Sequence, residues 1–87
     1  MHKVRNYKYP EIVKITEKEF EINIKGNKFE FETHSKDYDK KSTFIATVND
    51  LNLSYEGKPF SFKIKIENEQ IEKELNILNI KQIKYVL

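Results

Sequence analysis

The most regular alternation of hydrophobic and polar positions lies on either side of Gly26-Asn27. Hydrophobic side chains occupy every second position there, namely Phe20, Ile22, Ile24, Phe29 and Phe31. An alternation of period two predicts strands with one buried face, and a two-residue Gly-Asn loop is typical of a tight turn. Pairing Ile24 with Phe29 across the loop places all these side chains on one face, so we expect a β-hairpin.

A second alternating pair of segments surrounds residues 56–59, Glu-Gly-Lys-Pro. Pairing Tyr55 with Phe60 places Leu51 opposite Ile64 and predicts a second hairpin. Upstream, the hydrophobic residues change from even to odd positions at Asn49-Asp50. Such a change of phase predicts a bulge or a turn.

The remaining segments give weaker patterns. Residues 3–9 and 12–15 suit short strands, and residues 34–42 form a polar loop. Asn68 is a competent helix N-cap, and the hydrophobic residues at 71, 75 and 78 lie on one helical face, which predicts a short helix. Residues 79–87 alternate again and predict a closing strand, with a helix continuing to residue 86 as the alternative.

These elements predict one α+β domain over residues 1–87. We expect a small, mainly antiparallel β-sheet of five or six strands with two hairpins, and one short C-terminal helix packed on one face.

Composition narrows the classes of function. The 87-residue chain has no cysteine, which excludes disulfides and thiolate zinc sites. Its first twenty residues are rich in charge, and no apolar run approaches the roughly 18 residues of a membrane span. We therefore expect a cytoplasmic protein without a membrane segment. The abundance of Lys, Ile and Asn, with Arg5 as the sole arginine, indicates an AT-rich gene of a bacterium or phage.

No residue pattern indicates catalysis, a metal or a cofactor. The two glycines, Gly26 and Gly57, are both assigned to turns, which excludes glycine-rich phosphate loops. His34, Ser35, Asp37 and Ser42 share one loop, but neighbours in a loop are not a preorganised catalytic set. We expect no enzymatic activity.

Several side chains are candidates for contact with a protein partner. The expected first hairpin places Glu21 opposite Glu32, with Glu30 on the same outer face. Like charges opposite each other destabilise a strand pair, so lysines of a neighbouring strand, solvent or a basic partner must offset them. Tyr38 and Tyr55 lie near loop tips, and tyrosine is enriched in interfaces.

The N-terminal segment supports an alternative. Arg5, Tyr7, Lys8 and Tyr9 interleave cations with aromatic rings, with Lys81 and Lys84 as additional cations. This mixture is typical of proteins that stack single-stranded bases on rings. The small net charge of +2 argues against many phosphate contacts.

We therefore expect a non-enzymatic protein-binding module. Its most concrete form is a phage- or mobile-element-encoded inhibitor that binds a bacterial nuclease or defence complex stoichiometrically. A single-stranded nucleic-acid-binding β-domain is the alternative. An exposed edge strand would also allow a homodimer.

Overall fold

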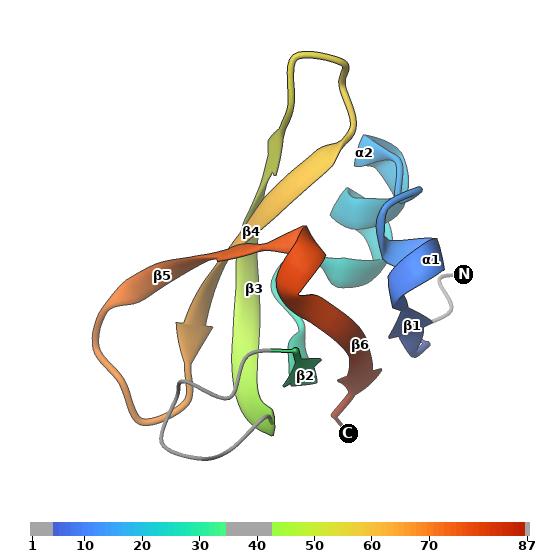
Figure 1. Cartoon of the computed structure of the whole chain (residues 1–87). Coiled ribbons are helices and arrows are strands. Elements are labelled where there is room, and N and C mark those ends of the chain that lie inside the picture. The colour runs from blue at the N-terminus through green and yellow to red at the C-terminus, as the bar shows by residue number, and fades with distance from the viewer. Residues whose placement is uncertain (1–4, 35–42, 87) are drawn as a thin grey trace.

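The computed structural model describes residues 5–34 and 43–86, and its main feature is a six-stranded antiparallel sheet. The strands in chain order are β1 (Tyr7–Lys8), β2 (Lys28–Thr33), β3 (Thr43–Leu53), β4 (Pro59–Ile66), β5 (Glu72–Asn76) and β6 (Ile80–Tyr85). Their spatial order is β1-β6-β2-β3-β4-β5, so the last strand is inserted between the first two (Figure 1). The expected small antiparallel sheet is confirmed.

Within residues 5–34 and 43–86, four short helical segments lie between the strands. They are α1 (Tyr9–Ile12), α2 (Glu17–Glu19), the π-helical turn η1 (Phe20–Ile24) and the 3₁₀ turn η2 (Ile77–Asn79). Three of the four precede β2, and they lie together on one side of the sheet (Figure 1). The expectation of one C-terminal helix is therefore wrong, because most of the helical structure is N-terminal.

The expected first hairpin is also wrong, because residues 17–24 are helical. Thr16 is the N-cap of α2, and its Oγ1 accepts a hydrogen bond from the Glu19 amide at 3.1 Å. Phe20 and Ile24 are both buried and are four residues apart, which places them on one side of a helix. Gly26, with φ +83°, follows the helical turn in the left-handed conformation that commonly ends a helix.

β2 pairs with β3 and β6 instead of with residues 20–24. Phe31 lies opposite Phe44 of β3 on one side and Ile83 of β6 on the other. The rings of Phe31 and Phe44 stack with centroids 5.4 Å apart. Glu32 consequently has no glutamate opposite it, and its neighbours in the ladders are Thr43 and Gln82.

β3 and β4 form the expected second hairpin, but in another register. Leu51 lies opposite Phe62 rather than Ile64. The register shifts between Val48 and Asp50, where the sequence predicted a bulge or turn, and again between Asn52 and Leu53. The second irregularity was not expected, and it prevents the predicted Tyr55–Phe60 pair.

Beyond β4 the chain turns into a strand instead of the expected helix. Asn68 adopts φ +75° in a turn rather than capping a helix, and β5 follows. Ile71 and Leu78, two members of the expected helical face, are exposed. The closing strand is confirmed as β6, and the alternative of a helix to residue 86 is wrong. The strand expected over 12–15 is absent from the described chain, since Ile12 ends α1 and residues 13–16 lie in a turn and a coil.

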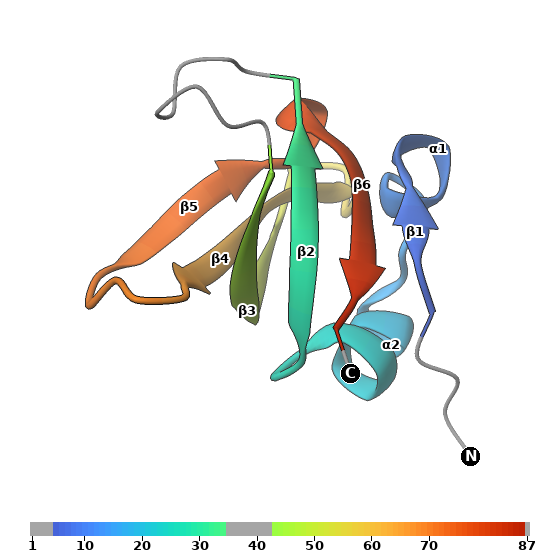
Figure 2. The ribbon, with the colours of Figure 1, turned by 90° about the horizontal axis from the view of Figure 1, so that it is seen from below.

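The core lies between the helical segments and one face of the sheet. Phe20 of η1 stacks on Phe62 of β4 with ring centroids 5.8 Å apart, which joins the two layers. The buried hydrophobic residues are Tyr7, Ile12, Ile15, Phe20, Ile24, Phe29, Phe31, Ala46, Val48, Phe62, Ile64, Ile77, Ile80 and Ile83. This packing leaves β1 and β5 as the two edges, on opposite sides of the molecule (Figure 2).

Candidate functional site

The five-residue edge strand β5 is the longer of the two sheet edges. It pairs with β4 in a regular register from Ser61↔Asn76 to Lys65↔Glu72, and within the described residues it pairs with no other strand. An edge strand directs alternate backbone N–H and C=O groups away from its neighbour. β5 can therefore accept a further strand through backbone hydrogen bonds.

The outer face of β5 carries two glutamates next to lysines of β4. Glu74 lies opposite Lys63, and Glu72 lies opposite Lys65. Lys63 in turn lies opposite Asp50 of β3. Charge thus alternates from strand to strand across this face and ends in negative charge at the edge.

Hydrogen bonds hold both carboxylates in place. Glu74 Oε2 accepts from Ser61 Oγ at 2.5 Å and from Asn52 Nδ2 at 2.8 Å, and Glu72 Oε2 accepts from Asn49 Nδ2 at 2.9 Å. The hydrogen bond from Ser61, followed by that from Asn52, lowers the pKa of Glu74 below its usual value. Glu74 is therefore anionic at neutral pH.

The other face of β5 is partly apolar. Leu75 packs against the core beside Phe62, and Lys73 makes an ion pair with Glu69 at 3.0 Å. Ile71, directly before the strand, is 71% exposed, the highest value among the exposed aliphatic side chains of the described chain. An added strand along β5 would cover part of this side chain.

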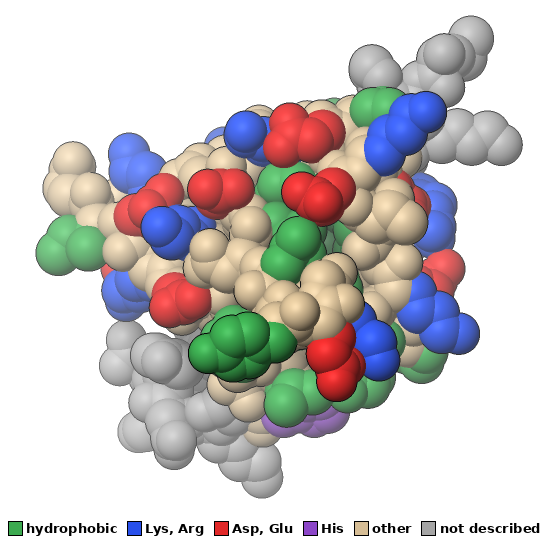
Figure 3. All heavy atoms as spheres, turned by 90° about the horizontal axis from the view of Figure 1, so that it is seen from above, with side chains coloured by type: hydrophobic (Ala, Val, Ile, Leu, Met, Phe, Trp, Pro, Cys, Tyr) green, Lys and Arg blue, Asp and Glu red, His purple; other side chains and the backbone are tan. Residues whose placement is uncertain are grey.

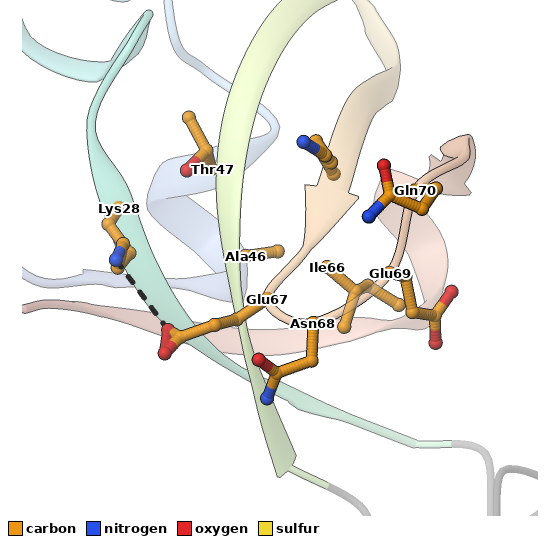
Figure 4. Close-up of a pocket in the computed structure, with 9 residues that line it drawn as sticks. Lys28, Ala46, Thr47, Ile66, Glu67, Asn68, Glu69 and Gln70 are labelled. Carbon is orange, nitrogen blue, oxygen red and sulfur yellow. Dashed lines mark ion pairs between the residues drawn. The ribbon is translucent and has the colours of Figure 1, made fainter.

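A shallow depression of about 270 Å³ lies where β4 turns toward β5 (Figure 4). Lys28 and Glu67 point toward each other there and form an ion pair at 3.6 Å. The remaining lining residues are Ala46, Thr47, Lys65, Ile66, Asn68, Glu69 and Gln70. Pockets for small organic ligands are usually larger, roughly 300–1,000 Å³, and mostly apolar, so this depression does not resemble one.

The hairpin between β3 and β4 presents the fully exposed Tyr55 at its tip. Leu53 and Phe60 nearby in the hairpin are also exposed, and Glu56 pairs with Lys58 at 3.4 Å. Figure 3 views this end of the molecule and shows hydrophobic side chains scattered among charges of both signs. No field of one sign covers this face.

The structure does not bring the expected partner-binding residues together. Glu21 lies on η1 and pairs with Lys25 at 3.6 Å, instead of facing Glu32. Glu30 lies opposite Lys84 of β6, and Glu32 accepts a hydrogen bond from Gln82. Lys84 and Gln82 are therefore the β6 neighbours of Glu30 and Glu32.

Two of the expected nucleic-acid-binding residues, Arg5 and Tyr7, make their polar contacts with other residues of the chain. Arg5 forms ion pairs with Glu11 at 2.7 Å and Glu19 at 3.5 Å, and its guanidinium lies 4.1 Å from the centroid of the Tyr7 ring. Tyr7 is fully buried, and its hydroxyl donates to Glu19 at 2.9 Å. No base can stack on this ring in the folded chain. Lys8 is exposed and the neighbouring Tyr9 is half-buried.

Burial and the Glu19 carboxylate raise the pKa of Tyr7 to about 12. The hydrogen bond from Arg5, assisted by the Lys8 amide, lowers the pKa of Glu11. The sequence alone did not predict Glu11 and Glu19 as the partners of Arg5, because they lie on two separate helical segments, α1 and α2, which meet only in the folded chain. The contacts therefore fix the N-terminal segment to the helices.

Across residues 5–34 and 43–86, no group of three or more His, Asp or Glu side chains is arranged to hold a metal ion. No helix in the described part of the chain is long and apolar enough to cross a membrane. Tyr38 and the loop residues Ser35, Asp37 and Ser42 lie outside the described residues.

No family model matches this chain. Searches among curated proteins and solved structures gave no match either. The candidate site therefore rests on the geometry of β5 alone.

Proposed function

We propose that this chain is a non-enzymatic, cytoplasmic protein-binding module that accepts an extended segment of a partner protein as a seventh strand along β5. The observation that carries the proposal is that β5 is a five-residue edge that pairs with β4 alone among the described strands. Strand addition obtains affinity from backbone hydrogen bonds and needs no deep pocket. This mode suits a surface whose depression near β5 is shallow and polar.

The opposite edge is poorly suited to the same role. β1 has only two residues, and Pro10, which has no backbone N–H, stands in the helix that follows directly. A strand added there would find few backbone partners. The proposal therefore places the partner on β5.

The more specific form of the proposal is a stoichiometric inhibitor of a bacterial nuclease or defence complex, encoded by a phage or mobile element. Its support is the small size of the chain and its abundance of Lys, Ile and Asn, which indicates an AT-rich gene. This form stays a prediction, and the identity of a captured partner tests it.

Hydrogen exchange on a purified complex tests the proposal directly. The tagged chain is used to capture its partner from lysate of the natural host, and amide exchange is compared in free and bound protein. We expect slower exchange over residues 71–76 on binding. Protection confined to residues 52–60 at the hairpin tip, or the failure of any stoichiometric complex to form, contradicts the proposal.

A matched pair of variants locates the contact independently. Ile71→Lys removes an apolar contact beside β5, and we expect it to weaken the complex roughly tenfold, the cost of about one buried aliphatic contact. Ile22→Lys changes a side chain that is also exposed, 46% against 71%, but lies on η1. The η1 variant should bind as the unmodified chain does.

A further inference from the structure

We infer that the strand accepted by β5 is basic, with Lys or Arg at alternate positions that face Glu72 and Glu74. This inference rests on the proposed function and names the chemistry of its partner. It follows from the charge pattern of the outer face, the fixed orientation of the two glutamates and the poor fit of a second copy of the chain.

The first step is the order of charges across the sheet. Asp50 of β3 lies opposite Lys63 of β4, which lies opposite Glu74 of β5. Residues directly opposite on neighbouring strands have side chains on the same face, and opposite charges there stabilise the pair. The next strand beyond Glu74 continues this order if it carries a cation at that position.

The second step is that two such positions exist at the correct spacing. Glu72 and Glu74 are two residues apart in one strand, so both side chains point to the same face. A partner strand meets both with residues that are also two apart. The residue between those cations points to the other face, opposite Lys73, which is paired with Glu69, and between Leu75 and Ile71, which favour an apolar side chain.

The third step is that the carboxylates are held at the edge before any partner arrives. Ser61, whose side chain is buried, and Asn52 both donate to Glu74, while Asn49 donates to Glu72. Anchoring each carboxylate through one oxygen reduces the rotamer freedom that binding would otherwise remove. Oε2 of each glutamate accepts these bonds, and Oε1 is not used in them.

A second copy of the chain fits this edge poorly. Two antiparallel β5 strands related by a twofold axis and fully overlapped place Glu74 of one copy opposite Glu74 of the other. A register centred on Lys73 places lysine opposite lysine and Glu72 opposite Glu74. A register centred on Leu75 avoids like charges, but only three residues of each strand then overlap. The occupant is therefore a different, basic segment.

Synthetic peptides test the inference without knowledge of the natural partner. The probe is a seven-residue peptide that alternates Lys with Val, compared with a twin in which Glu replaces every Lys and with a scrambled peptide of the same composition as the probe. Binding is measured by fluorescence anisotropy, and its location by hydrogen exchange. We expect the alternating Lys peptide to bind at least roughly tenfold more tightly than the Glu peptide, from two cross-strand charge pairs. Slower exchange should appear at residues 72–76, and the scrambled peptide should bind weakly.

Charge variants separate a specific contact from attraction by net charge. Glu72→Lys should weaken binding of the Lys peptide and improve binding of the Glu peptide. Glu56→Lys alters the net charge equally at the exposed hairpin tip and should leave both affinities unchanged. Glu74→Gln keeps an amide oxygen for Ser61 and Asn52 but removes the charge, so it should weaken the Lys peptide without loss of the fold.

The outcomes distinguish the inference from the proposed function. Equal binding of the Lys and Glu peptides with protection of β5 overturns the charge preference and leaves strand addition intact. Equal losses from Glu56→Lys and Glu72→Lys, or no binding of the Lys peptide at millimolar concentration, also overturn the inference. Protection of another surface in the complex with the natural partner overturns the proposed function itself.

Discussion

The two edges of the sheet differ in how they are protected. At β1 the strand is two residues long, α1 follows at once, and Pro10 removes one backbone donor. At β5 the strand is five residues long and carries charge on its side chains. At the first edge the course of the backbone leaves few groups for strand pairing, whereas at the second edge the charged side chains limit which strands can pair.

This difference matters because charge excludes some strands and admits others. A short edge followed by proline offers few backbone partners to any added strand, whatever its sequence. On our proposal, an edge lined by Glu72 and Glu74 disfavours acidic strands and admits a basic one. An edge protected in this way is selective, which is a property expected of a binding surface.

The same contrast appears in the side chains that support each edge. Arg5 and Tyr7, a residue of β1, make their polar contacts with Glu11 and Glu19 of the same chain, so their polar groups already have partners. The carboxylates of β5 are held by neutral donors, which orient their charge without neutralising it. The lysines of β4, Lys63 and Lys65, lie opposite them.

The largest effect is expected from a change that damages the layer supporting the whole sheet. Phe62→Ala removes a fully buried ring that stacks on Phe20 and lies edge-on to Phe31. Such a cavity costs about 3–5 kcal/mol, a large fraction of the stability of a small domain. Urea unfolding followed by circular dichroism measures the loss, and exchange should accelerate at both edges.

Phe60→Ala is the matched control for this change. Phe60 is on the same strand but is 49% exposed, so its truncation should cost much less. Equal losses of stability in the two variants would contradict the role of Phe62 as the ring that joins the helical segments to β4.

A second change should loosen the β1 edge alone. Tyr7→Phe removes the hydroxyl that donates to Glu19 at 2.9 Å, and we expect a loss of about 1–2 kcal/mol, since the acceptor is charged but partly exposed. Amide exchange should accelerate at residues 7 and 8 and remain unchanged at residues 72–76. Equal acceleration at both edges would show that the edges are not independent.

The same variant should change the alkaline limb of stability. Burial and Glu19 raise the pKa of Tyr7 from 10.0 to about 12, above its value in the unfolded chain. The folded state therefore holds this proton more tightly, and the associated stability, fully present below pH 10, is lost as the pH rises toward about 12. Tyr7→Phe should lose less stability over this interval than the unmodified chain does, as measured by urea unfolding at several pH values.

The sequence predicts the sheet better than it predicts which segments join it. Phe44, Ala46 and Val48 alternate in β3, and the phase change at Asn49-Asp50 marks a real irregularity. The alternation near Ile83 and Tyr85 likewise predicts β6. In these segments the alternating residues Ala46, Val48 and Ile83 are buried, so the local pattern and the tertiary structure agree there.

The errors occur where one pattern fits two structures. Phe20, Ile22 and Ile24 alternate, but Phe20 and Ile24 are also one helical turn apart, and the exposure of Ile22 in the structure separates the two interpretations. Thr16 and Glu19 form the Ser/Thr-x-x-Glu pattern typical of a helix start, and this signal favours the helix. The Gly26-Asn27 turn signal favours the hairpin instead.

The candidate site was missed for a related reason. Ile71, Leu75 and Leu78 have helical spacing, so the sequence predicts a helix in the segment that contains Glu72 and Glu74. They lie at the edge because β5 pairs with β4, while the next strand, β6, pairs with β2 instead of with β5. The β6–β2 pairing joins residues about 50 positions apart, such as Glu32 and Gln82. Local periodicity carries no information about pairing at that range.

The smallest effect is expected at β5. Glu74→Gln removes a charge whose pKa is lowered by hydrogen bonds from Ser61 and Asn52. Because the folded-state pKa lies below the unfolded value, the associated stability is present above pH 4.5 and is lost as the pH falls through the folded-state pKa. The variant should therefore show a flatter acid limb in urea unfolding measured between pH 6 and 3, with little change at pH 7.

Amide exchange in the same Glu74→Gln variant should accelerate at residues 72–76 and stay constant at residues 7 and 8, the reverse of the pattern for Tyr7→Phe. Glu56→Gln, at the exposed hairpin tip, removes a charge far from β5 and serves as the control for exchange at residues 72–76. An unchanged acid limb in Glu74→Gln would mean that the carboxylate is not held at the edge, and the contrast between a closed β1 and a charge-guarded β5 would lose its physical basis.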